Sequence, residues 1–188
     1  NSINSQSDIF INISIQNAAN LTDFIRTWNN TNHSFYNASL VLSFNFDNVE
    51  EIGETTATAV DTSSHGNNGV ISGPRYTPFA KYSSALTFDG VDDLVSVIDR
   101  SRSGDPSLDF TDAITVSAWI QYSNNKTQNI LSKSGSYRIY TQAASGKAVF
   151  SLVGPTVSSI TGISNLADGQ WHHIGGTYKN ESTANNFR

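Results

Sequence analysis

Two adjacent histidines, His172 and His173, lie between Trp171 and a pair of glycines in the segment WHHIGGTY, residues 171–178. Paired histidines can act as metal ligands or as general bases. The segment reads as a β-strand, and neighbouring side chains of a strand point to opposite faces of its sheet. The two imidazoles therefore cannot bind one ion together. We interpret the segment as a packing motif in which Trp171 fills space, one histidine forms a hydrogen bond inside the protein, and Gly175 and Gly176 permit close approach or a bulge.

Carboxylates gather in the segment FDGVDD, where Asp89, Asp92 and Asp93 follow Phe88. Calcium binds six to eight oxygen ligands, and clustered carboxylates can supply several of them. Aspartates in turns also accept hydrogen bonds from their own backbone N–H groups. The sequence leaves both a calcium site and a purely structural turn open. We expect the Phe88 side chain to enter the core.

The segment DTSSHGNNG, residues 61–69, lacks the spaced carboxylates of an EF-hand loop, so we expect a tight loop in which Asp61 anchors backbone amides. Glycoside hydrolysis needs two carboxylates that flank the scissile bond. The acids of EEIGE, residues 50–54, lie outside any strand pattern, and the strands predicted below over 114–120, 137–141, 147–153 and 171–178 contain none. A Gly-x-Ser-x-Gly elbow and a phosphate-binding loop are also absent. We therefore predict that the protein is not an enzyme.

Composition excludes several further classes of protein. The chain has 188 residues, a formal net charge of −5 and no run of Lys or Arg that would favour nucleic acid. It has no apolar stretch near the roughly 20 residues that span a bilayer. It has no cysteine, so disulfides, thiolate nucleophiles and Cys-ligated zinc are excluded. Because it begins at Asn1, we expect a processed chain or a fragment.

Asparagine sequons cluster at the start of the chain. Five of the seven Asn-x-Ser/Thr sequons lie within residues 1–39, where chance predicts about two. Such clustering indicates an extracellular or cell-surface glycoprotein. The seven candidate glycosylation sites are Asn12, Asn20, Asn29, Asn32, Asn37, Asn125 and Asn180.

Residues 1–39 differ in pattern from the rest. The segment DIFINISIQ, residues 8–16, alternates Ile9, Ile11, Ile13 and Ile15 with other residues, which predicts a strand. The segment NLTDFIRTWNN, residues 20–30, predicts a short helix. The sequence therefore predicts an N-terminal extension with one strand and one short helix.

Short strands separated by turn residues follow from residue 40 onward. This pattern predicts an all-β fold, a two-sheet antiparallel sandwich. The predicted strands are 40–46, 84–88, 94–98, 114–120, 128–133, 137–141, 147–153 and 171–178.

The motifs ALTFDGVDDLVSV, TDAITVSAWI, ILSKSGSY and DGQWHHIGGTY occur in this order after LSFNFD and VDTSSHGNNGVISG. Together they resemble the laminin G-like (concanavalin A-like) jelly-roll modules of bacterial and archaeal surface proteins. The resemblance covers about residues 39–180 and implies a jelly roll of two antiparallel sheets, carbohydrate or protein ligands and, in some members, calcium. It also implies Asp47 as a further calcium neighbour.

The resemblance predicts a module over 40–188 that lacks the family's last strands and an extension over 1–39 outside the module. The strand over 8–16 can fill that vacancy within its own chain. It can also insert into another copy of the chain, as a donor strand does. A series of such insertions would build a filament or a layer.

Alternation in residues 114–120 predicts that Ile114, Val116, Ala118 and Ile120 face the core and that Trp119 faces outward. On a concave sheet Trp119 would be a sugar-stacking platform beside Arg138 and Tyr140, and the alternative is a Trp119 covered by a loop. Two functions remain. One is a non-catalytic extracellular module that binds a glycan or a surface protein, and the other is a subunit of a glycosylated filament or layer.

Overall fold

A computed structural model of the chain describes the backbone of residues 24–28 and 31–36 and all atoms of residues 39–100, 104–124, 126–153 and 158–180. The chain divides into two compact units, residues 1–40 and 41–188, and each is described by itself. The strand predicted over 8–16 lies outside the described residues.

The described part of the first unit is an antiparallel β-hairpin of β1 (Phe24–Trp28) and β2 (Thr31–Tyr36), with an irregular register after Phe24. The short helix predicted over 20–30 is therefore wrong. Its core segment, FIRTW, consists mainly of aromatic and β-branched residues, which favour strands. The four apolar positions of so short a window do not distinguish a helix from a strand, and pairing with β2 decides the outcome.

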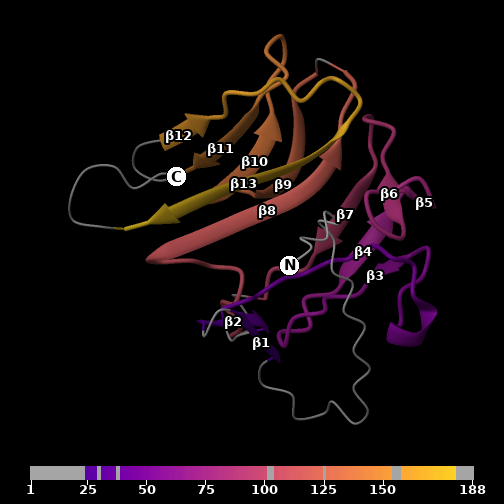
Figure 1. Cartoon of the computed structure of the whole chain (residues 1–188), viewed down its shortest axis with the longest axis vertical. Helices are drawn as coiled ribbons and strands as arrows, with labels where there is room; N and C mark the ends of the chain where they lie inside the picture. The colour runs from indigo at the N-terminus through magenta and orange to yellow at the C-terminus, as the bar shows by residue number, and fades with distance from the viewer. Residues whose placement is uncertain are drawn as a thin grey trace, which may run out of the picture. The chain divides into compact units, whose positions relative to one another are not determined.

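The second unit is built of antiparallel sheets, and its largest sheet has the strand order β12-β11-β10-β9 (Figure 1). The residues of β10 alternate between buried and exposed positions, as the geometry of a strand requires. Tyr137, Ile139 and Thr141 are buried, while Arg138 is exposed. The strands of this sheet are β9 (Gln128–Lys133), β10 (Tyr137–Thr141), β11 (Ala148–Leu152) and β12 (Ser158–Thr161).

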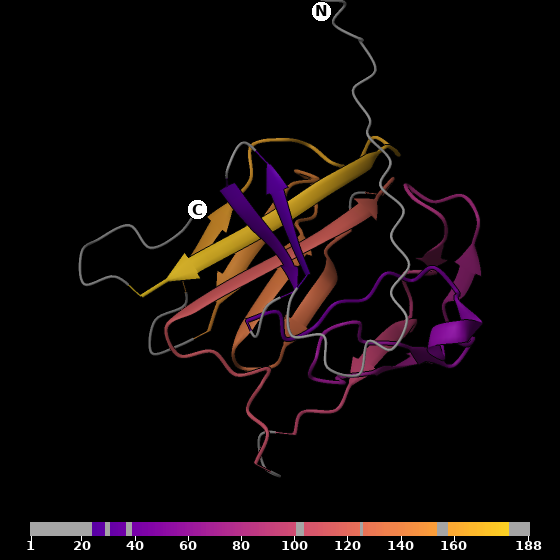
Figure 2. The ribbon, with the colours of Figure 1, turned by 60° about the horizontal axis from the view of Figure 1, so that its bottom comes forward.

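A second layer consists of two nine-residue strands, β8 (Ala113–Gln121) and β13 (Trp171–Lys179), which pair along their whole length. Figure 2 shows this pair crossing the face of strands β9 to β12. The hydrophobic core lies between the two layers. Its buried members are Val116, Tyr122, Tyr137, Ile139, Phe150, Leu152, Leu166 and Ile174.

Gly176 of β13 brings the two layers together at the Phe150 side chain of β11. A Cβ atom at position 176 would lie 2.7 Å from the Phe150 Cβ, closer than two carbon atoms can approach without a shift. At the neighbouring Gly175, a Cβ would meet only ordinary contacts of 3.4 Å or more. Of the two alternatives for the glycine pair, close approach is confirmed and belongs to Gly176, and β13 pairs with β8 without the register shift of a bulge.

Two smaller sheets complete the second unit, with the strand orders β3-β4-β7 and β5-β6. A single turn of 3-10 helix, η2 (Glu50–Ile52), precedes them. Their strands are β3 (Thr58–Ala59), β4 (Gly69–Ser72), β5 (Arg75–Thr77), β6 (Ala85–Thr87) and β7 (Leu94–Val97).

The all-β antiparallel sandwich predicted from the sequence is confirmed. The seven strands predicted from residue 84 onward all form, with ends that differ by one residue or a few. Strands β3, β4, β5 and β12 were not predicted, because their segments are short or rich in Gly and Ser and gain stability from pairing with neighbours.

The strand predicted over 40–46 is wrong, because these residues form no regular strand. The Ser43 backbone bonds to the loop at Asp61 instead. Its N–H donates to Asp61 Oδ1 at 2.9 Å, and its carbonyl accepts the Thr62 N–H at 2.9 Å. Phe46 and Asn48 have φ angles of 56° and 57°, which a strand does not allow.

Asp61 is the anchor that the sequence predicted for the loop over 61–69. This carboxylate is 6% exposed. Besides Ser43, it accepts the N–H groups of Ser63 and Asn67 and the Ser63 hydroxyl. A buried carboxylate with this many donors is stable because each hydrogen bond offsets part of its lost hydration.

Among the described residues, no helix is both long and apolar enough to cross a membrane.

The contact at Gly176 predicts a large difference between two otherwise identical substitutions. Gly176→Ala drives a methyl group into Phe150 and is expected to lower the free energy of unfolding by about 1–3 kcal/mol. Gly175→Ala is the matched control and is expected to change it by less than about 1 kcal/mol. Urea titration followed by tryptophan fluorescence measures both values. Equal effects of the two substitutions would contradict the close approach of β13 to β11.

Candidate functional site

Trp119 lies on the outward face of β8. The burial of this strand alternates along its whole length, and the residues predicted to face the core, Ile114, Val116, Ala118 and Ile120, all pack against it. That prediction is confirmed. Trp119 is 43% exposed, which is high for the largest apolar side chain.

Three side chains surround Trp119. His173, its register partner on β13, has its ring centre 5.2 Å from the indole. Tyr82 meets the indole edge-on at 6.0 Å, with the two rings 85° apart. The Lys81 ammonium lies 5.0 Å from the centre of the indole ring. We call these four residues the Trp119 surface.

Lys81 and Tyr82 belong to the loop over 78–84 between β5 and β6. This loop exposes Phe79 by 83% and Tyr82 by 66%, so it displays apolar rings to solvent. Ser83 has a φ of 45°, a left-handed conformation that is uncommon for a residue other than glycine. The loop covers Trp119 only in part. This outcome lies between the two alternatives that the sequence left open, an exposed stacking platform and a side chain covered by a loop.

Arg138 and Tyr140 lie on the opposite side of the molecule from Trp119. They alternate with the buried residues of β10, so they occupy the outer face of the β9–β12 sheet, whereas Trp119 occupies the outer face of the β8–β13 pair. The predicted placement of Trp119 beside them is wrong. A single strand pattern shows which residues share a face but not which sheet lies behind it.

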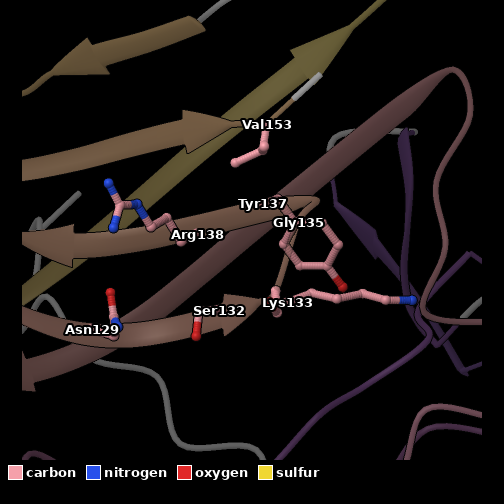
Figure 3. A pocket seen from close by; sticks show the side chains of 8 residues that line it. Asn129, Ser132, Lys133, Gly135, Tyr137, Arg138 and Val153 are labelled. Atoms are coloured by element: carbon pink, nitrogen blue, oxygen red, sulfur yellow. The ribbon is translucent and has the colours of Figure 1, made fainter. Parts of the chain in front are cut away.

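The outer face of the β9–β12 sheet has a shallow hollow of about 280 Å³ beside Arg138 (Figure 3). We call it the Arg138 hollow. The Arg138 guanidinium lies over the Tyr140 ring, 4.2 Å from its centre, and Ser132 is the register partner of Arg138 on β9. The hollow is lined by Asn129, Ser132, Lys133, Ser134, Gly135, Tyr137, Arg138 and Val153.

Two polar groups of the Arg138 hollow are engaged elsewhere. The Lys133 ammonium pairs with Asp109 and, at 3.3 Å, with Asp99. Burial alone would lower the pKa of Lys133, but the hydrogen bonds to these carboxylates outweigh it and raise that pKa. The Tyr137 hydroxyl donates to the Leu108 carbonyl at 3.0 Å, and burial raises its pKa. The hollow therefore offers a ligand few polar groups beyond Asn129, Ser132 and Arg138.

The turn carboxylates Asp89, Asp92 and Asp93 lie together, with one oxygen of each within 4.8 Å of the others. Two of them also hold the turn. Asp93 Oδ2 accepts the Asp89 N–H at 2.8 Å, and Asp89 Oδ1 accepts the Val91 N–H at 2.8 Å. The prediction that Phe88 enters the core is wrong, because this side chain is 48% exposed.

Asp47 is not part of this cluster among the described residues. The donor set itself fits calcium, because three carboxylates offer hard oxygen ligands and Asp92 has no hydrogen bond of its own within the described residues. Bound there, a calcium ion would link the ends of the turn. The Asp89–Asp93 bond shows that the turn also has a structural role.

The two histidines of β13 act separately, as the sequence predicted, but the hydrogen bond of His172 is at the surface and not inside the protein as expected. His173 contacts Trp119, whereas His172 Nε2 lies 2.8 Å from Asp168 Oδ1. The hydrogen bond with His172 is the main cause that lowers the pKa of the exposed Asp168 carboxyl. Neither histidine belongs to a group of metal-ligating side chains in the described part of the chain.

Most of the predicted glycosylation sites lie outside the described residues. Asn180 is described and is exposed after β13, with its N–H bonded to the Asp112 carbonyl. Only the backbone of Asn32 is described, within β2. The strand-donor residues Ile9, Ile11, Ile13 and Ile15, and the sites Asn12, Asn20, Asn29, Asn37 and Asn125, lie outside the described residues, so their roles stay predictions.

Comparison with known families agrees with this architecture. A family model for laminin G-like domains of the concanavalin A-like lectin/glucanases superfamily matches residues 89–187. The chain belongs to this superfamily. No curated protein matches the chain. The match covers β8 to β13, the strands that build both layers of the core and hold Trp119, His173 and Arg138. Laminin G-like domains of this type are carbohydrate- or protein-binding modules and are typically non-catalytic.

Sequence reasoning missed Lys81, Tyr82 and the contact of His173 with Trp119. A signal was present, since the loop over 78–84 combines Phe79, Lys81 and Tyr82 between two predicted turns. Such a loop is too rich in aromatic residues for a simple connection. Its position against β8 depends on tertiary structure and could not be read from the sequence.

The hydrogen bonds of the aspartate turn predict unequal effects of two substitutions in metal-free buffer. Asp93→Ala removes the acceptor of the Asp89 N–H and is expected to lower the free energy of unfolding by about 1 kcal/mol. Asp92→Ala, the matched control, removes a carboxylate without such a bond and is expected to change it by less than about 0.5 kcal/mol. Thermal unfolding in EDTA measures the difference. A larger loss from Asp92→Ala would contradict this account of the turn.

Proposed function

We propose that this chain is a non-catalytic, extracellular carbohydrate-binding module that mediates adhesion to glycans through the Trp119 surface. The observation that carries the proposal is Trp119 itself, 43% exposed on the outer face of β8, with Tyr82 standing edge-on beside it. The superfamily supports the class of ligand, since carbohydrate binding is one of the two activities of such domains.

The geometry of the rings supports a saccharide rather than a fully apolar ligand. A pyranose ring has an apolar C–H face that stacks on an aromatic ring, while its hydroxyl groups need polar partners around the rim. Trp119 and Tyr82 stand at 85° to each other and so present two apolar ring surfaces in different directions. Lys81 and His173 supply polar groups within contact distance of the same indole.

The distribution of carboxylates supports a role without catalysis. Hydrolysis of a glycosidic bond needs two carboxylates placed across the scissile bond. Strands β3 to β13 contain no Asp or Glu at any position, so neither sheet face presents such a pair. The carboxylate cluster at Asp89, Asp92 and Asp93 lies on an exposed turn.

Laminin G-like modules are commonly extracellular, which supports an extracellular place for this chain. The cluster of sequons in residues 1–39 supports the same place and N-glycosylation there. Asn180 is exposed and is therefore accessible to a glycosyltransferase.

A glycan array tests the proposal. Wild-type protein is expected to bind a subset of glycans, and Trp119→Ala is expected to weaken that binding at least tenfold by removing the stacking platform. Arg138→Ala on the opposite face is the control and is expected to leave binding unchanged. Because Trp119 is on the outer face, its substitution is expected to lower the melting temperature by only a few degrees. Binding lost with Arg138→Ala and kept with Trp119→Ala would move the site to the Arg138 hollow.

We further propose that calcium binds the aspartate turn in the folded protein. Ligand binding to the folded state alone raises stability, by about 2.7 kcal/mol at a hundredfold excess over Kd. Millimolar CaCl₂ is therefore expected to raise the melting temperature of the wild type and not that of Asp92→Ala, which keeps the turn but loses a ligand. MgCl₂ at the same concentration controls for ionic strength. A calcium shift of equal size in both proteins would place the ion elsewhere, and no shift in either would refute this site.

A further inference from the structure

Lys81 holds its charge at the centre of the Trp119 surface. Its Nζ lies 5.0 Å from the centre of the Trp119 ring and 5.7 Å from that of Tyr82. Both distances are within the range over which a cation is attracted by an aromatic ring. The flexible lysine side chain is thereby kept where a saccharide on the two rings would meet its ammonium group.

The charge of Lys81 is not neutralised within the described part of the chain. The ion pairs found there join Lys133 to Asp99 and Asp109, and His172 to Asp168. Lys81 is exposed and takes part in none of them. An aromatic ring attracts a cation but does not cancel its charge, so the ammonium group remains available to an anion.

The charge of the Trp119 surface also differs in sign from the net charge of the protein. The chain carries a formal net charge of −5, yet none of the four residues of this surface is acidic and one of them is a lysine. His173, the register partner of Trp119, adds a second nitrogen base beside the indole. An anionic group on a ligand would meet complementary charge here, whereas a neutral ligand would leave the Lys81 charge without a partner.

We propose that the Trp119 surface selects anionic saccharides, whose sugar rings carry a carboxylate or a sulfate. The apolar face of the sugar stacks on Trp119 beside Tyr82, and the Lys81 ammonium pairs with the anionic group. This inference rests on the proposed function and adds the class of glycan and the residue that selects it.

The test compares matched acidic and neutral oligosaccharides on one array. The probes are trisaccharides of galacturonate, glucuronate and mannuronate, each beside the corresponding neutral galactan, glucan or mannan trisaccharide, together with sulfated galactan fragments. At least one acidic probe is expected to bind about tenfold more tightly than its neutral counterpart. The preference is expected to shrink in 1 M NaCl, because salt screens an exposed ion pair. Carboxylate and sulfate probes show which anion is preferred.

Three variants isolate the role of Lys81. Lys81→Gln keeps most of the side-chain length and is expected to abolish the preference for the acidic probe over its neutral counterpart. Lys81→Arg is expected to retain the preference, since the positive charge remains. Lys126→Gln, which removes one exposed positive charge elsewhere, is the control for overall charge and is expected to behave as the wild type.

Several outcomes would overturn the inference. Equal binding of acidic and neutral probes would refute it while leaving carbohydrate binding intact. Stronger neutral binding in Lys81→Gln, without a change for acidic probes, would show that Lys81 only covers the indole. A loss of preference in Lys126→Gln as well would refute a specific role for Lys81. Absence of wild-type binding to every glycan would refute the proposed function itself.

Discussion

The fold depends on the close approach of Gly176 to Phe150. The two layers of the sandwich pack closely because β13 has a glycine, and so no side chain, at the position that the large Phe150 side chain of β11 approaches. Phe150 fills that place and belongs to the same buried cluster as Val116, Ile139 and Ile174. This contact fixes which face of β13 is inside, and through the register of β13 with β8 it fixes the faces of β8 as well.

The fixed register has a direct consequence for the surface. With Ile174 and Val116 inside, His173 and Trp119 must be outside and opposite each other. On the other layer, Ile139 is inside and Arg138 is outside. The residues that could meet a ligand therefore form two surfaces separated by the thickness of the core. A ligand of ordinary size meets one surface or the other, and for this reason substitutions at Trp119 and Arg138 distinguish between them.

Hydrogen bonds to a buried carboxylate stabilise the part of the second unit that has little regular structure. Asp61 accepts backbone N–H groups from Ser43, Ser63 and Asn67, and Glu54 accepts that of Val49 at 2.9 Å. These bonds satisfy backbone groups that a sheet would otherwise pair. These hydrogen bonds hold the segment from residue 41 to 68 in place although it contains no long strand. The next strand, β4, pairs with β3 and β7.

The sequence by itself determined the strands of the core and the sides they present. In 114–120 the apolar residues Ile114, Val116, Ala118 and Ile120 occupy every second position, and the alternation of a strand follows from local backbone geometry. The loop around Asp61 was also predictable, because an aspartate followed by Ser, Gly and Asn residues forms its bonds within a few positions. In these segments the local pattern and the final structure agree.

Tertiary structure alone decided the rest. Residues 40–46 alternate as a strand does, yet their hydrogen bonds go to a loop some twenty residues away, and residues 24–28 pair in a hairpin instead of forming a helix. Lys81 and Tyr82 meet Trp119 across nearly forty residues of chain. Local preferences amount to about 1 kcal/mol or less per residue, so pairing and packing with distant segments override them. The sequence thus determined that Trp119 faces outward, and only the packed structure determined what surrounds it.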